Sequence, residues 1–152
     1  MEGKDRSEKA EQIVNLKPFE WKVSAEAFHR YAYQYYECKR AFSPPNFSLI
    51  PYNLLCRAIE LELKARLLKR MTLNEVRKFR HHLLKAYNAL EAPEQILSEE
   101  ERAVLKTADE LYRKTELAYF HLEPAMKAYE GYPDLNALDA IAKKLIASGS
   151  TS

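Results

Sequence analysis

The sequence predicts an all-α protein, an antiparallel up-and-down bundle of four main helices followed by short C-terminal helices. Apolar residues recur at spacings of three and four over most of the chain, which is the period of a helix with one buried face. The seven prolines fall between these periodic segments or at their starts, where a missing N–H costs little. Only three glycines occur, too few for the positive-φ turns of an all-β chain.

The first main helix is expected from Ser24, which suits an N-cap, to Ala41. Its inward stripe at helical spacing comprises Phe28, Tyr31, Ala32, Tyr35 and Phe42. We interpret the aromatic residues as packing and not as a platform for stacked bases, because aromatic side chains at this spacing mostly belong to a core.

The second main helix is expected over 48–70, with Pro51 tolerated in its first turn. Leucine, isoleucine and alanine occupy two sides of this helix, so it should lie centrally and be contacted on both. Arg57, Glu60 and Lys64 follow one another at i, i+3 and i+7, and we expect the carboxylate to pair in both directions.

The third main helix is expected over 72–90, with Thr72 as a candidate N-cap. The fourth should begin at Ser98, which forms a capping box with Glu101, and continue to about 120. A short segment over 124–129 and a last helix opening at Asp134 complete the pattern.

The length of the chain suits one domain, which we place at 15–147 between a flexible polar tail, 1–14, and a flexible C-terminal tail, 148–152. No apolar run is long enough to span a membrane and the first residues lack an apolar signal region, so we expect a cytoplasmic protein without a membrane partner.

Cys38 and Cys56 are expected to be reduced thiols. Phosphate-loop and metal-ligand spacings are absent from the sequence, so we expect no cofactor and no metal.

Charge is distributed unevenly along the chain. Between residues 64 and 85, eight lysines and arginines oppose Glu75 alone, so this segment carries +7 and the remainder carries −5. The candidate binding residues are Lys64, Arg66, Lys69, Arg70, Arg77, Lys78, Arg80, His81 and Lys85. Such a segment attracts RNA or nucleotide phosphates. The alternative is a solvated helical face opposed by an acidic surface of a partner protein.

Adjacent histidines lie within this segment. On a continuous helix over 72–90, Phe79 and Leu83 face the core and His81 lies at roughly 140° from Val76, nearly opposite to them. His81 is therefore predicted to point outward beside cationic neighbours, and Leu84, off the core face, to suit a partner surface.

The stretches "LLCRAIELELKARLLKRM" and "VRKFRHHLLKAY" resemble the HEPN family (higher eukaryotes and prokaryotes nucleotide-binding domain), in particular its compact single-domain members, over about 24–145. Glu60, Leu63 and Lys64 match the family's E-x-x-L-K helix, and Phe79, His81 and Leu83 match the element that follows. Arg80 replaces the usual glycine and His82 the usual Asp or Asn, so we expect the helix to continue. The resemblance implies nucleotide binding and a homodimer.

Many catalytic HEPN proteins are RNases whose signature is an arginine and a histidine with four to six residues between them, and Arg77 and His82 have four residues between them. On a straight helix Arg77 and His81 would instead face together. The resulting expectation is a nucleotide, RNA or acidic-protein binder that uses the region from the second to the third helix without catalysis. One alternative is a toxin-like, metal-independent endoribonuclease using Arg77 with His81 or His82. The other is a structural module that pairs with a nucleotidyltransferase.

Overall fold

The structure is a computed structural model that describes residues 24–149. Every regular element in this range is a helix, which confirms the all-α fold class. The predicted tail at 1–14 lies outside the described residues, and so do positions 150–152 of the predicted C-terminal tail. None of the helices within 24–149 combines the length and the apolar character needed to cross a membrane.

Helix α2, Ala25–Ala41, begins where the sequence predicts, because the Ser24 hydroxyl accepts a hydrogen bond from Ala27 N at 3.2 Å. Its buried face is narrower than expected. Ala32 and Tyr36 are buried, whereas Tyr31 and Phe42 are exposed, so their assignment to the inward stripe was wrong. The helix packs against α3 and α8, and the Tyr36 hydroxyl donates to Asp139 of α8 at 2.9 Å.

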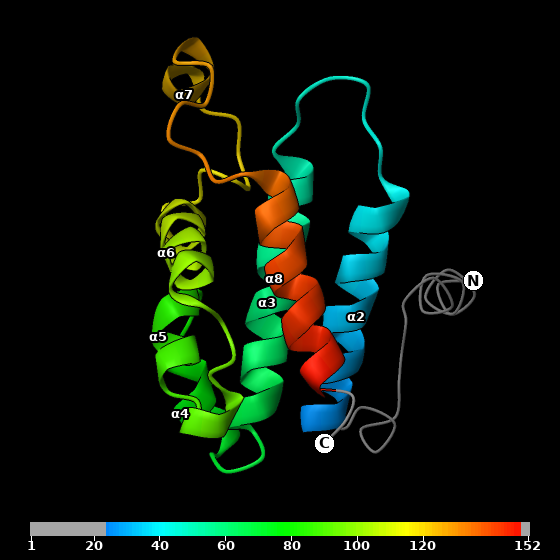
Figure 1. Ribbon diagram of the computed structural model, residues 1–152, viewed down its shortest axis with the longest axis vertical. Helices are drawn as coiled ribbons and strands as arrows, with labels where there is room; N and C mark the ends of the chain where they lie inside the picture. Colours follow the sequence, from blue (N-terminus) through cyan, green and yellow to red (C-terminus); the bar gives the residue numbers. More distant parts are fainter. Residues whose placement is uncertain (1–23, 150–152) are drawn as a thin grey trace, which may run out of the picture.

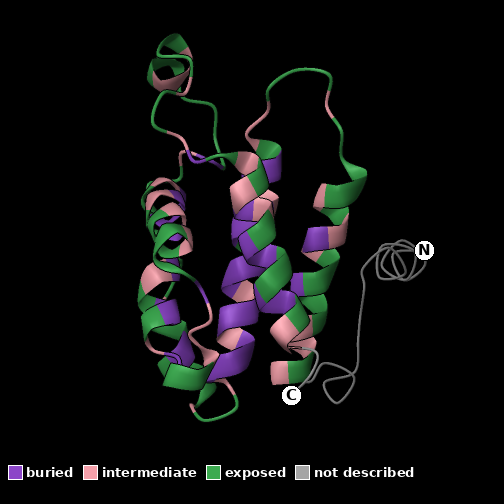
Figure 2. Ribbon diagram, in the orientation of Figure 1, coloured by how far each residue is buried: buried purple, intermediate pink, exposed green. Residues whose placement is uncertain are grey.

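Helix α3, Ile50–Leu67, confirms the prediction of a central helix with Pro51 in its first turn. Buried side chains occur around most of its circumference, and Figure 2 shows it as the most continuously buried element. It contacts α2 and α8 on one side and α5 and α6 on the other. In Figure 1 it runs along the bundle between these neighbours.

The predicted third helix is wrong as a continuous element. The chain forms α4, Leu73–Arg77, and α5, Leu83–Asn88, separated by a turn in which Arg80 has a φ of +50°. Tertiary contacts cause the break. The Leu83 N–H, which a continuous helix would bond to residue 79, donates instead to the buried Asp109 carboxylate at 2.7 Å. Thr72 nevertheless caps α4, in a capping box with Glu75.

The break also changes where α5 faces. Leu83, Ala86 and Tyr87 are buried, and Leu84, which we expected on a partner surface, packs partly buried against the same core. That expectation for Leu84 is therefore corrected. The expectation assumed one continuous helix over 72–90, whereas the chain forms two helices, α4 and α5, with a turn between them.

Helix α6, Glu99–Arg113, starts at the predicted capping box of Ser98 and Glu101 but ends well before residue 120. Thr115, with a φ of +60°, is incompatible with continuation. A 3-10 turn, η2 at Ala92–Glu94, precedes α6, and α7, Leu122–Met126, follows it. Helix α8, Leu135–Gly149, opens as predicted after Asp134, whose carboxylate accepts from Ala137 N at 3.0 Å.

Candidate functional site

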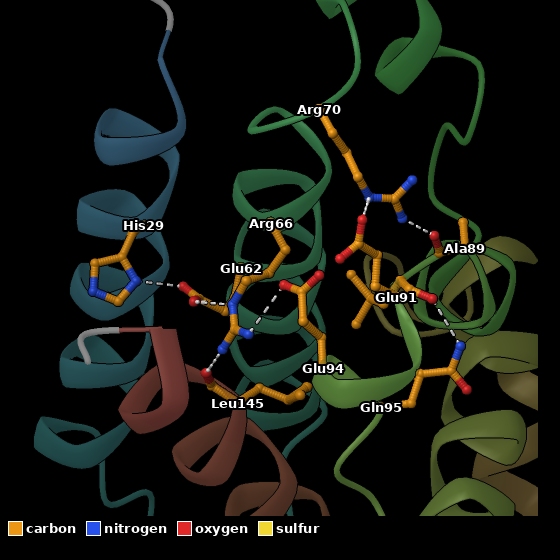
Figure 3. A network of polar contacts seen from close by, with 10 residues as sticks. His29, Glu62, Arg66, Arg70, Ala89, Glu91, Glu94, Gln95 and Leu145 are labelled. Atoms are coloured by element: carbon orange, nitrogen blue, oxygen red, sulfur yellow. Dashed lines mark hydrogen bonds and ion pairs between the residues drawn. The ribbon is translucent and has the colours of Figure 1, made fainter. Parts of the chain in front are cut away.

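Some of the predicted binding residues make their polar contacts with other residues of the fold. Arg66 is only 6% exposed and is held by Glu62, Glu94 and the backbone carbonyl of Leu145, as Figure 3 shows. His29 of α2 approaches the same Glu62 at 2.6 Å. Burial raises the pKa of Glu62, and His29 and Arg66 partly oppose that shift. Arg66 therefore stabilises the packing of α2, α3 and α8 and is not available to a ligand.

Two further cations are also engaged. Arg70 pairs with Glu91 at 3.8 Å and donates to the carbonyl of Ala89, contacts also drawn in Figure 3. Lys64 lies 3.3 Å from Glu60 and its side chain is 15% exposed. Lys69 is exposed on the stretch after α3. The high basic count of the segment thus overstates the charge that a ligand would meet.

Four other predicted binding residues have no such contacts with carboxylates. Arg77, Lys78, Arg80 and Lys85 are all exposed, and none of them pairs with an acidic side chain anywhere in residues 24–149. We call this set the cationic turn. Arg77, Lys78 and Arg80 line, with Asn74, an open cleft of about 410 Å³. Arg77 ends the five-residue helix α4, and Lys78 and Arg80 belong to the turn that follows it.

Glu60 of α3 lies behind this turn and is the most heavily engaged carboxylate of the site. Its side chain is 5% exposed and contacts Arg57 at 3.5 Å and Lys64 at 3.3 Å, which confirms the predicted pairing in both directions. The Tyr112 hydroxyl of α6 donates to Glu60 Oε2 at 2.8 Å. Burial, followed by the Glu60 charge, raises the pKa of Tyr112. Tyr112 is therefore a permanent donor to this carboxylate.

His81 completes the cluster. Its Nδ1 lies 2.6 Å from Glu60 Oε1, its ring meets Tyr112 edge-on with centroids 5.5 Å apart, and its side chain is 57% exposed. His81 is exposed, as predicted, but it does not lie on a continuous helix, because the turn places its ring against Glu60 of α3 and Tyr112 of α6. A carboxylate oxygen accepts, so Nδ1 is the donor in this contact and Nε2 is the ring nitrogen that the contact does not use.

His82 has a different environment. Its Nδ1 is buried 3.0 Å from Asp109 Oδ2 but without hydrogen-bond geometry, and no described residue supplies another partner. Asp109 accepts from Leu83 N and also lies 3.4 Å from Arg113 Nε. Arg77 makes no polar contact with either histidine within 24–149, so the spacing of Arg77 and His82 does not assemble a pair in one chain.

Asp109 and Tyr112, two residues of the site, were not predicted from the sequence. Both lie on the buried face of α6, Asp109 four residues after Leu105. An acidic residue on an otherwise apolar stripe was the signal that could have found Asp109, because such a group is buried only with partners. A tyrosine at helical spacing on this face indicates packing, and nothing in the sequence indicates what its hydroxyl contacts.

Within residues 24–149, no three histidine, cysteine or carboxylate side chains gather in an arrangement that could hold a metal ion. The arrangement offers instead an exposed imidazole fixed by a buried carboxylate, beside unpaired guanidinium and ammonium groups. Comparisons with protein-family models, with curated proteins and with solved structures find no match to this chain.

Proposed function

We propose that the chain binds the phosphate groups of RNA or of a nucleotide through the cationic turn. The observation that carries this proposal is that Arg77, Lys78, Arg80 and Lys85 are exposed and lack acidic partners among the described residues. Other exposed cations, such as Arg30 and Lys106, also lack acidic partners within 24–149, and what distinguishes this set is that Arg77, Lys78 and Arg80 line one cleft. The guanidinium group of arginine can donate two hydrogen bonds to two oxygens of one phosphate. A cleft lined by two arginines and a lysine could therefore bind a phosphate group.

The HEPN resemblance implies the same class of ligand. HEPN proteins usually carry glycine at the position of Arg80, and here Arg80 adopts a φ of +50°, which a glycine would adopt without strain. This agreement supports the resemblance at the one position where the sequence departs from it most visibly.

A titration of fluorescently labelled single-stranded RNA tests the proposal. The double variant Arg77→Ala/Arg80→Ala should bind about tenfold more weakly, which corresponds to about 1.4 kcal/mol. The matched control is Arg30→Ala/Lys106→Ala, which removes the same charge from exposed positions on α2 and α6. Equal affinities of the two variants, or no binding by the unaltered chain, would reject the cationic turn as the site.

Cleavage of RNA is a second candidate function, favoured by the contact between Glu60 and His81. The carboxylate fixes the ring so that Nε2 can take the proton of a ribose 2′-hydroxyl. The hydroxyl oxygen would attack phosphorus, the bond to the 5′-oxygen would break, and the departing oxygen would take a proton from water. The products would be a 2′,3′-cyclic phosphate and a 5′-hydroxyl, and DNA would be untouched. Cations beside the ring would stabilise the charge on the phosphate.

Incubation with total RNA in the presence of EDTA separates the two candidates. Cleavage predicts cyclic phosphate ends from the unaltered chain, loss of that product in His81→Gln, and a large decrease in Glu60→Gln. If the chain binds RNA but forms no cleavage product at any pH from 5 to 8, the binding proposal stands and the cleavage proposal is rejected.

A further inference from the structure

A second cleft, of about 240 Å³, adjoins the cleft that Arg77 and Arg80 line. Two apolar and three charged side chains line this second cleft, namely Met71, Phe79, Glu75, Lys78 and Lys85. We call it the Phe79 cleft and the first one the arginine cleft. Lys78 lines both. A phosphate held in the arginine cleft would therefore bring the group attached to it close to the Phe79 cleft.

The apolar part of the Phe79 cleft suits a flat ring. Met71 and Phe79 both line the cleft and are both packed, partly buried, against the core, so the bundle holds them in place. An aromatic side chain beside phosphate-binding cations is a common platform for a base of a single strand, because every base has a π face. A duplex keeps its bases stacked on one another, so the cleft fits an unpaired base.

The polar part of this cleft contains a carboxylate with one oxygen in use. Glu75 Oε1 accepts from Thr72 N at 3.3 Å and from Thr72 Oγ1 at 3.0 Å in the capping box of α4. Glu75 Oε2 has no hydrogen-bond partner within 24–149. Among the residues that line the two clefts, Glu75 alone is acidic. Its charge repels a phosphate, so it favours a ligand only where a donor of that ligand meets Oε2.

The bases differ in how well they meet a carboxylate next to ammonium groups. Glu75 Oε2 can only accept while the side chain is ionised, and Lys78 and Lys85 can only donate. Guanine carries two adjacent donors, N1–H and the N2 amino group, beside the acceptor O6. Adenine and cytosine carry a single amino group on that edge. Uracil places a carbonyl oxygen on each side of its one N–H, so it meets the carboxylate poorly. Guanine is therefore the base that complements this cleft best.

We propose that the Phe79 cleft selects an unpaired guanine whose phosphate lies in the arginine cleft, an inference that rests on the phosphate binding proposed for the cationic turn. The ligand is then a guanosine phosphate, either free or as part of a single strand. Neither the charge of the turn nor the HEPN resemblance favours one base over another. The selection comes from Glu75 and the two lysines that share its cleft.

A titration of fluorescent hexanucleotides against the full, unaltered chain tests the selection. The four RNAs are UUGUUU, the same strand with inosine in place of guanosine, UUUUUU, and a strand with an abasic third position. The guanosine strand should bind about tenfold more tightly than the other three, because inosine lacks the N2 amino group and uracil and the abasic site lack both donors. Guanosine 5′-monophosphate as a competitor separates the two sources of the ligand: displacement of the strand assigns a free nucleotide, no displacement assigns the strand, and either result supports the selection.

Glu75→Gln identifies the residue responsible. Glutamine preserves the capping box but removes the charge, so the preference for guanosine over inosine should disappear while UUUUUU binds more tightly. The matched control, Glu100→Gln, removes an exposed carboxylate from the first turn of α6 and should keep the preference.

Two outcomes would overturn the selection of guanine. Equal affinities for all four strands would leave phosphate binding intact and remove the base site, and a preference for guanosine that survives Glu75→Gln would remove Glu75 from it. Failure of every strand to bind is a different result, because it would reject phosphate binding at the cationic turn and the base site with it.

Discussion

At the scale of single residues, the site depends on how Glu60 is satisfied. A carboxylate that is 5% exposed must be compensated, and here an imidazole, a phenol, a guanidinium and an ammonium surround it. The contact that satisfies one carboxylate oxygen also fixes the ring of His81.

Removing the phenol hydroxyl tests that compensation. Tyr112→Phe should lower the free energy of unfolding by about 2 kcal/mol, because a buried charged acceptor loses a hydrogen bond. Urea denaturation measures the change. Tyr119→Phe, which alters a ring that is 67% exposed, is the control and should change the value by less than about 0.5 kcal/mol. Equal effects of the two substitutions would show that Glu60 does not depend on Tyr112.

At the scale of elements, the sequence predicts where helices begin but not the turn between α4 and α5. The helix starts at Ser24, Thr72 and Ser98 were predictable, because capping uses residues within the same few positions. The break was not predictable, because arginine and lysine favour helix and no glycine or proline occurs within residues 78–82. Its cause is long-range, namely the contacts of His81 and Leu83 with Glu60 and Asp109.

Glycine substitutions test the turn directly. Arg80→Gly should leave the free energy of unfolding nearly unchanged, because relief of the left-handed strain offsets the greater entropy of the unfolded chain. Lys85→Gly, at an exposed position inside α5, should lower it by about 1 kcal/mol. Thermal denaturation compares them. If both substitutions were equally costly, residues 72–90 would form the continuous helix and not the turn.

The capping box of α6 gives a pH-dependent prediction. Hydrogen bonding of Glu101 to the Ser98 backbone lowers the pKa of this carboxyl below its ordinary value of 4.5. A lowered folded-state pKa contributes stability above about pH 4.5, and this contribution disappears as the pH falls through the folded-state pKa. Glu101→Gln should therefore cost about 1 kcal/mol at pH 7 and almost nothing near pH 2. Urea denaturation at the two pH values measures this difference, and a constant cost would contradict it.

At the scale of the whole molecule, the predicted binding residues include cations that the fold pairs and cations that it leaves exposed. The charge pattern of the sequence located the basic segment, but it predicted a binding role for all nine candidate residues alike. Only the fold separates Arg66, which is buried among carboxylates, from Arg77 and Arg80, which are not. The exposure of Phe120 and Met126 was likewise hidden in the sequence, because it depends on α6 ending at Arg113 and not continuing.

The salt dependence of RNA affinity tests the central proposal most directly. Each phosphate contact to a single strand contributes about −0.7 to the slope of log affinity against log salt, so four contacts predict about −3 for the unaltered chain. The variant with alanine at 77, 78, 80 and 85 should give a slope near zero. Equal slopes for the two proteins would contradict the account, since the exposed cations of the turn would then contribute nothing to binding.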